Sequence, residues 1–283
     1  MSSDPFGTLV PKIIDVGEAS PNWRRKKTVR TVVAIGAAIL SLKVIYGFDP
    51  HGDRQIKVFK QQLGFNQKGN IERQWWAVDT VIFKTATGAS TWTVPGDCQS
   101  ATFHGWGAGG GGGRADSWTT NIGGAGGAGG MYCSVTLSLT SGSTVYLNIG
   151  SKGIGATNAN GNTSGGDGGD TWVNKSANSA PASTTNGLLA KGGQGGQNTG
   201  SSTPGGVASA TTNGVGTTKS KGGDGGTYDV ASSDRSGAGG GGSGGPNGAG
   251  SNGGNKNNAT VAGTAGGAAD NSTVAGGNGG TSS

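Results

Sequence analysis

The sequence has few of the residues that build catalytic and metal sites. Two histidines and two cysteines occur in 283 residues, and they lack the ligand spacings of structural zinc sites. No Gly-x-Ser-x-Gly motif lies at a strand–helix junction, and neither His-Glu-x-x-His nor Gly-x-x-x-x-Gly-Lys-Ser/Thr occurs. The aspartates show no spacing typical of a general acid/base pair. We therefore expect a protein that is not an enzyme and that carries no cofactor.

Charged residues are also scarce, at 13% of the chain, and they are unevenly distributed. Residues 1–77 contain 12 Lys/Arg and 6 Asp/Glu, whereas residues 78–283 contain nine of each. The whole net charge of +6 therefore belongs to the N-terminal part. Because the C-terminal part is neutral, it has no electrostatic attraction for nucleic acid, and we expect no nucleic-acid partner.

Glycine is what the sequence has in abundance, with 54 of its 63 glycines between Gly105 and the C-terminus. Gly-Gly-x-Gly-Gly blocks recur there, starting at Gly123, Gly165, Gly192, Gly222, Gly241 and Gly276. Their irregular spacing excludes collagen and a solenoid of fixed repeat length. A left-handed helix with three residues per turn directs its N–H and C=O groups outward, so neighbouring glycine helices can bond to one another. The blocks predict such a polyglycine-II bundle rather than a disordered linker.

Short segments with strand patterns precede and interrupt the glycine blocks. They are Val78–Phe83, Trp92–Val94, Thr102–Trp106, Tyr132–Leu139 and Val145–Ile149, and the pairs Trp172-Val173 and Leu188–Ala190 form a predicted hairpin stem. We predict a mainly β protein in which residues 78–283 form a small β-sandwich followed by a bundle of polyglycine-II helices.

The N-terminal part has a different composition and is expected to serve as an anchor. Residues 1–50 are predicted to be an extended arm with one apolar helix. Residues 51–77 are predicted to form a stalk or collar, and Gln55–Phe65 within them has helical spacing. The run from 31 to 48 is about 18 residues long and includes one lysine, whereas a membrane-spanning helix needs ~20 apolar residues. A membrane span and a helix or strand buried against a partner protein are both alternatives for this run. The anchoring residues would be Arg24, Arg25, Lys26, Lys27, Val32, Ile35, Ile39 and Leu40.

Two pairs of residues invite a specific chemical interpretation. Cys98 and Cys133 both fall in the predicted sandwich, where we expect two buried thiols, with a disulfide as the weaker alternative. Asp167 and Asp170 lie in a stretch that fits a single calcium-binding nonapeptide. Such sites need consecutive repeats to complete their oxygen ligands, so we expect no metal and keep calcium as the weaker alternative.

The order of several motifs resembles a known family. Thr91–Pro95 is followed by Trp106–Ala108, which runs into Gly109–Gly113; Gly126–Tyr132 and Gly165–Trp172 come later. This series resembles the glycine-rich domain of bacteriophage tail fibres and adhesins. The resemblance implies a virion protein with a rigid glycine bundle, and loops at the end of the bundle that contact the host cell surface.

The expected function is that of a phage fibre or spike protein displayed outside the virion. Residues 1–77 would attach it to capsid, tail or collar proteins, with the N-terminus embedded in the particle or in a membrane. The loops, with Trp118, Tyr228 and Arg235 as candidate contacts, would bind a host glycan or outer-membrane protein. A homotrimer is left open. The alternatives are a purely structural capsid or tail spike or cement protein, and a membrane-anchored bacterial surface protein.

Overall fold

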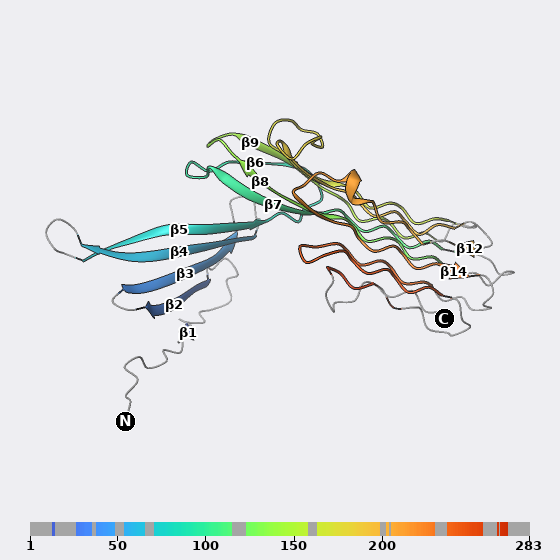
Figure 1. The fold of residues 1–283 in the computed structure, drawn as a ribbon, viewed down its shortest axis with the longest axis horizontal. Helices are drawn as coiled ribbons and strands as arrows, with labels where there is room; N and C mark the ends of the chain where they lie inside the picture. The colour runs from blue at the N-terminus through green and yellow to red at the C-terminus, as the bar shows by residue number, and fades with distance from the viewer. Residues whose placement is uncertain are drawn as a thin grey trace, which may run out of the picture. The chain divides into compact units, whose positions relative to one another are not determined.

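The chain folds mainly into β-strands, as the sequence predicts. The computed structural model describes residues 13–14, 27–35, 38–48, 54–65, 71–114, 123–157, 163–198, 202–203, 205–229, 237–256, 265 and 267–270. Within these residues the structure has 14 strands and one short 3-10 helix. The chain divides into two units, Met1–Thr85 and Ala86–Ser283 (Figure 1).

One antiparallel sheet forms the N-terminal unit, with its strands in the order β1-β2-β3-β4-β5. The strands are β1 (Ile13–Ile14), β2 (Lys27–Ile35), β3 (Ala38–Phe48), β4 (Arg54–Phe65) and β5 (Ile71–Phe83). β2 and β3 are rich in β-branched residues, which favour the pleated backbone of a strand. Each strand pairs with the next one in the chain, so the sheet is a simple meander.

The predicted apolar helix over 31–48 is wrong, because this stretch forms parts of two paired strands. Val32 and Ile35 lie on β2, and Ile39 and Leu40 lie on β3. Periodicity alone cannot assign an apolar run of this length to helix or strand, and the β-branched residues on either side of the connection favour strands.

The other N-terminal predictions have mixed outcomes. Gln55–Phe65, which has helical spacing in the sequence, lies within strand β4. Lys27 is the first residue of β2, whereas Arg24, Arg25 and Lys26 lie outside the described residues. Among the residues that the structure describes, no helix has the length and apolar character needed to cross a membrane.

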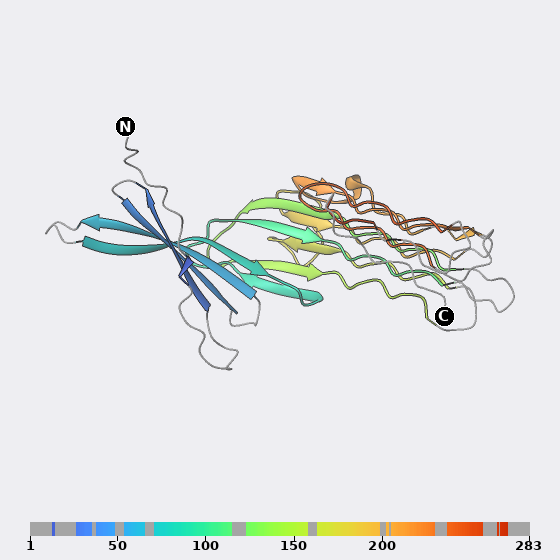
Figure 2. The same cartoon turned by 90° about the horizontal axis from the view of Figure 1, so that it is seen from below.

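Two antiparallel sheets face each other in the C-terminal unit (Figure 2). One has the strand order β11-β10-β9-β6 and the other β13-β8-β7, and β10 and β11 pack against β7 and β8. The strands are β6 (Gly88–Thr93), β7 (Ser100–Trp106), β8 (Tyr132–Ser138), β9 (Thr144–Ile149), β10 (Thr171–Asn174), β11 (Gly187–Ala190) and β13 (Thr218–Ser220). A separate pair is formed by β12 (Ser202–Thr203) and β14 (Tyr228–Asp229), and the 3-10 helix is Thr211–Asn213.

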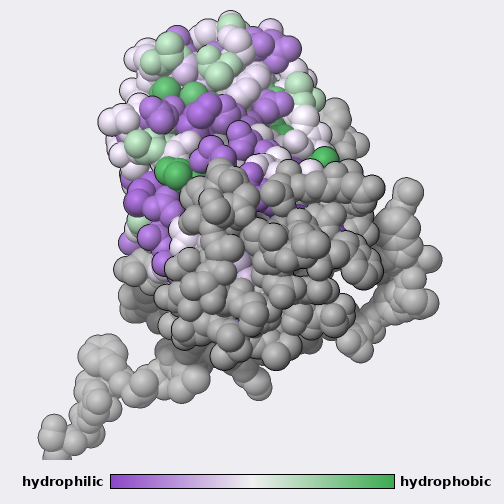
Figure 3. Space-filling view, turned by 90° about the vertical axis from the view of Figure 1, so that its right-hand side faces the viewer, coloured by the Kyte–Doolittle hydropathy of each residue, from purple (hydrophilic) through white to green (hydrophobic). Residues whose placement is uncertain are grey.

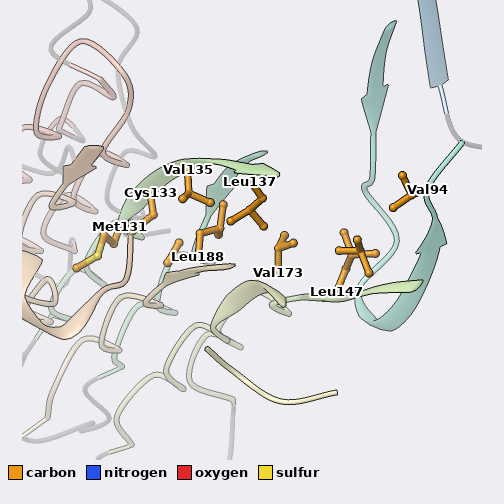
Figure 4. Close-up of a cluster of buried hydrophobic side chains, with 10 residues drawn as sticks. Val94, Met131, Cys133, Val135, Leu137, Leu147, Val173 and Leu188 are labelled. Carbon is orange, nitrogen blue, oxygen red and sulfur yellow. The ribbon is translucent and has the colours of Figure 1, made fainter. Parts of the chain in front are cut away.

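Apolar side chains fill the space between the two sheets (Figure 4). The buried cluster contains Val94, Met131, Cys133, Val135, Leu137, Val145, Leu147, Val173, Leu188 and Ala190. In β8 the inward residues alternate with more exposed ones, as expected for a strand with one buried face. At the edge of the cluster, the rings of Trp92 and Phe103 meet edge to face with centroids 6.0 Å apart. This core makes the sandwich a conventional hydrophobic fold.

Candidate functional site: the glycine bundle

Strands of the sandwich continue directly into extended glycine-rich segments, which run side by side away from it (Figure 1). β7 ends at Trp106 where the first segment begins, and the second segment leads into β8 at Tyr132. We number the described segments in chain order. They are segments 1 (107–113), 2 (123–131), 3 (150–156), 4 (163–170), 5 (191–198), 6 (205–210), 7 (221–227), 8 (238–245), 9 (248–256) and 10 (265 and 267–270).

Backbone hydrogen bonds join neighbouring segments at every third residue. Segment 1 donates three of these bonds to segment 2, which runs in the opposite direction. The donor–acceptor pairs are Gly107–Met131, Gly110–Ala128 and Gly113–Ala125, with N···O distances of 2.8 to 2.9 Å. The spacing of three leaves two residues between successive donors, and these residues face other directions.

The intervening residues of segment 1 bond to other segments. The N–H groups of Ala108 and Gly111 donate to segment 4 at 3.0 and 2.9 Å, and their carbonyls accept from segment 5. The carbonyls of Gly109 and Gly112 accept N–H groups of segment 3 at 2.9 Å. Segment 1 is therefore bonded to segments 2, 3, 4 and 5, whereas a β-strand pairs with at most two neighbours. The glycine segments form a three-dimensional bundle and not a sheet.

Glycine is required on the faces where segments meet. A Cβ added to Gly107 would lie 2.0 Å from the Lys191 carbonyl oxygen, and one added to Gly126 would lie 1.9 Å from that of Gly239. A Cβ on Gly109 would instead make an ordinary 3.6 Å contact with the Ala128 carbonyl oxygen. The close approach of backbones thus fixes glycine at some positions of a segment and leaves space for a side chain at others.

In three blocks the polar third residue, Asp167, Gln194 or Asp224, uses this space to bond another segment. On segment 4 a row of acceptors with a period of three faces a row of N–H groups on segment 5. The pairs are Ser164 with Asn198, Asp167 with Gly195 and Asp170 with Gly192, at 3.1, 2.8 and 2.9 Å. Sequence reasoning missed this role, although polar residues recurring at the third position of the blocks were a visible signal.

Similar side-chain bonds link other segments. Asn252 on segment 9 accepts the N–H of Asp224 at 2.8 Å, and Asn255 accepts that of Thr227 at 2.9 Å. The Asp224 carboxylate in turn accepts the N–H of Ala208 at 2.8 Å. Side chains at these positions therefore complete the hydrogen bonding of the backbone.

Asp167 and Asp170, the residues of the calcium alternative, face segment 5. Asp170 also forms a 2.5 Å ion pair with Lys191, and both side chains are 34% exposed. An ion pair this accessible to water contributes little to stability. Among the residues that the structure describes, no group of three His, Cys, Asp or Glu side chains is placed to hold a metal ion. The two carboxylates act here as acceptors for backbone N–H groups and for a lysine.

The cysteines are separate thiols, so the disulfide alternative is wrong. Cys133 is fully buried on β8, and its Sγ donates to the Leu189 carbonyl oxygen at 3.0 Å. Burial raises the pKa of Cys133 to about 11, and nearby Lys219 only partly offsets this. Cys98 is partly exposed and donates to the Ser100 carbonyl oxygen at 3.3 Å. Cys133 therefore behaves as a small apolar core residue.

At the far end of the bundle, opposite the sandwich, many of the described segments begin or end (Figure 1). The chain between these ends, residues 115–122, 158–162, 199–201, 204, 230–236 and 257–264, lies outside the described residues. Among their described flanks, Arg114 and Thr163 form a backbone bridge, and the Arg114 carbonyl accepts the Asn198 side-chain amide. Seen from this end, the described surface that is visible is largely polar with small separate apolar patches (Figure 3).

The three candidate contact residues do not share one environment. Tyr228 lies on β14, pairs with Thr203 of β12, and is 0% exposed. Its burial places the side chain in the interior of the unit instead of in a surface loop, and its backbone also forms a bridge with Lys256 of segment 9. Trp118 and Arg235 lie outside the described residues.

Comparison with known proteins concerns the C-terminal unit. The model of the glycine-rich domain family matches residues 84–283. No curated protein and no solved structure matches the chain. The matched region begins close to Ala86, the first residue of the C-terminal unit, and therefore includes both the sandwich and the glycine segments.

Proposed function

The chain belongs to the glycine-rich domain family over residues 84–283, and we propose that it is a fibre or spike protein of a phage virion that binds the host cell surface. The observation that carries this proposal is the densely bonded bundle, whose described segments begin or end opposite the sandwich (Figure 1). Connections held by a rigid scaffold are suited to recognition, because their sequences can vary without changing the scaffold.

In this proposal the glycine segments are polyglycine-II helices. The hydrogen bonds that recur every third residue, and the four bonded neighbours of segment 1, support this assignment. A helix with three residues per turn points successive N–H groups in three directions, which is the pattern that such bonds require. The bundle would be stiff, because each helix is hydrogen-bonded to neighbouring helices on several sides.

Recognition is assigned to the connections that contain Trp118 and Arg235. Tryptophan and arginine are the residue types most often found at binding hot spots. The partner would be a glycan or a protein of the host outer membrane. The N-terminal unit, with the basic residues that precede β2, would attach the protein to other virion proteins or embed it in a membrane, and a homotrimer would suit a fibre.

Binding of the labelled full-length protein to intact host cells tests the proposal, together with its ability to block infection. We expect saturable binding, and we expect Trp118→Ala and Arg235→Ala each to weaken it at least ~10-fold. Lys152→Ala is the matched control, because Lys152 is exposed on the side of the bundle. Absence of binding by a folded protein would reject host recognition and favour a purely structural spike. Equal weakening by the control would reject the assignment to the connections.

A further inference from the structure

One face of the glycine bundle has unused backbone groups in the residues that the structure describes. Segment 2 donates to segment 7 through Gly126 and Gly129, and to segment 5 through Ala128 and Met131. Its third row of N–H groups has no partner among the described residues. This row consists of Gly124, Gly127 and Gly130.

Segments on both sides of this row have matching unused acceptors. Segments 1 and 8 each donate to carbonyls of segment 2, so they flank it. On segment 1 the carbonyls that accept no hydrogen bond from a described residue are those of Gly107, Gly110 and Gly113. On segment 8 they are those of Ala238, Gly241 and Gly244. We call these three rows together the unpaired face.

The unpaired face is not a solvent-exposed surface. Five of its nine residues are buried and four are half-buried; the half-buried ones are Gly110, Gly113, Gly124 and Gly241. Buried backbone N–H and C=O groups are nearly always hydrogen-bonded, because leaving one without a partner costs free energy comparable to a lost hydrogen bond. The N–H row of segment 2 and the carbonyl rows of segments 1 and 8 all repeat every third residue. A single extended backbone with the same repeat can form hydrogen bonds with all three rows.

We propose that the last glycine block of the chain, Gly276–Gly280, forms an eleventh segment that occupies the unpaired face. All five earlier Gly-Gly-x-Gly-Gly blocks, at 123, 165, 192, 222 and 241, lie in bonded segments of the bundle. The sixth has the same sequence pattern. Residues 271–283 contain no charged side chain, so their burial would incur no charge desolvation.

The position of segment 10 gives the block access to this face. Asp270 donates its N–H to the Ser243 carbonyl at 2.8 Å, which places it near the sandwich end of segment 8. Five residues separate Asp270 from Gly276, enough to span roughly 16–18 Å when extended. The block would then run back toward the far end of the bundle, opposite in direction to segments 8 and 10. Docking of this block is independent of what the bundle binds.

Amide hydrogen exchange, followed by NMR on the full chain labelled with ¹⁵N-glycine, tests the proposal. We expect Gly124, Gly127 and Gly130 to be protected to a degree similar to Gly126 and Gly129. Removal of 271–283, or Gly277→Val, should accelerate exchange at the first three amides by at least about 10-fold while the other two stay protected. Asn278→Ala is the matched control, because the third position of a block has space for a side chain.

Three results would overturn the proposal. The first is fast exchange of Gly124, Gly127 and Gly130 in the intact chain, which needs no variant and holds even if the truncated protein fails to fold. The second is unchanged protection after truncation. The third is protection that depends on protein concentration and survives truncation, which would assign the face to a second copy of the chain.

Discussion

The sandwich and the glycine bundle belong to the same unit, yet opposite properties of side chains stabilise them. In the sandwich, side chains such as Leu188 and Val145 are buried between two sheets. In the bundle, stability comes from backbones that approach so closely that a Cβ on Gly126 would lie 1.9 Å from a carbonyl oxygen. The chain first passes from the sandwich into the bundle between Trp106 and Gly107. Hydrophobic burial and backbone bonding are thus separable sources of stability within one domain.

Adding a methyl group inside the bundle should have the largest effect. Gly126→Ala is expected to destabilise the unit by about 4 kcal/mol, because the new Cβ meets the backbone of Gly239, which cannot move without breaking its own bonds. Gly109→Ala is the matched control and should be nearly neutral, since its Cβ has 3.6 Å of space. Calorimetric unfolding of the two variants measures the difference. Equal stability would show that the segments are not held in close contact.

Removing methyl groups should be most harmful in the sandwich. Leu188→Ala deletes a side chain that is 0% exposed and is expected to cost about 3 kcal/mol through lost burial and the remaining cavity. Ile154→Ala on segment 3 is the control, and it should cost less than about 0.5 kcal/mol because Ile154 is 71% exposed. Denaturant unfolding compares the two. A large loss from the control would mean that Ile154 is buried in an assembly.

A smaller effect is expected where a side chain completes the bonding of the bundle. Asp167→Ala leaves the Gly195 N–H without its 2.8 Å acceptor and should cost about 1 kcal/mol. Asp167→Asn keeps an acceptor oxygen and should retain most of the stability, which separates hydrogen bonding from charge. The free energy of unfolding of both variants is the measurement. Similar losses in both would assign the effect to charge.

The regions of the chain differ, for physical reasons, in how closely their sequence predicts their structure. Thr102–Trp106 and Tyr132–Leu139 were recognised as strands because one face of each is buried, which imposes an alternation that the sequence displays. The helix expected over 31–48 was wrong, since an apolar run without clear periodicity fits both structures. The bonding role of Asp167 was missed because its partner, Gly195, is distant in the chain.

The sequence predicted the type of candidate site, a glycine bundle, but not which residues lie on its surface. The glycine blocks indicated a bundle, and the described glycine segments are bonded side by side. Tyr228 was chosen as a loop contact, but it is 0% exposed and lies on β14, which pairs with β12. A two-residue strand leaves no periodic signal in the sequence, so its burial could not be read locally.

The sequence by itself determined where backbones can approach one another, because only glycine leaves room for a carbonyl oxygen about 2 Å from the position of Cβ. It also determined the sandwich strands through their alternation. Only the tertiary structure decided which segments are neighbours, such as the contact of segment 2 with segments 1, 5, 7 and 8. Backbone N–H and C=O groups are chemically the same at every glycine, so the choice of partner depends on the three-dimensional path of the chain, which the sandwich core and the lengths of the connections constrain.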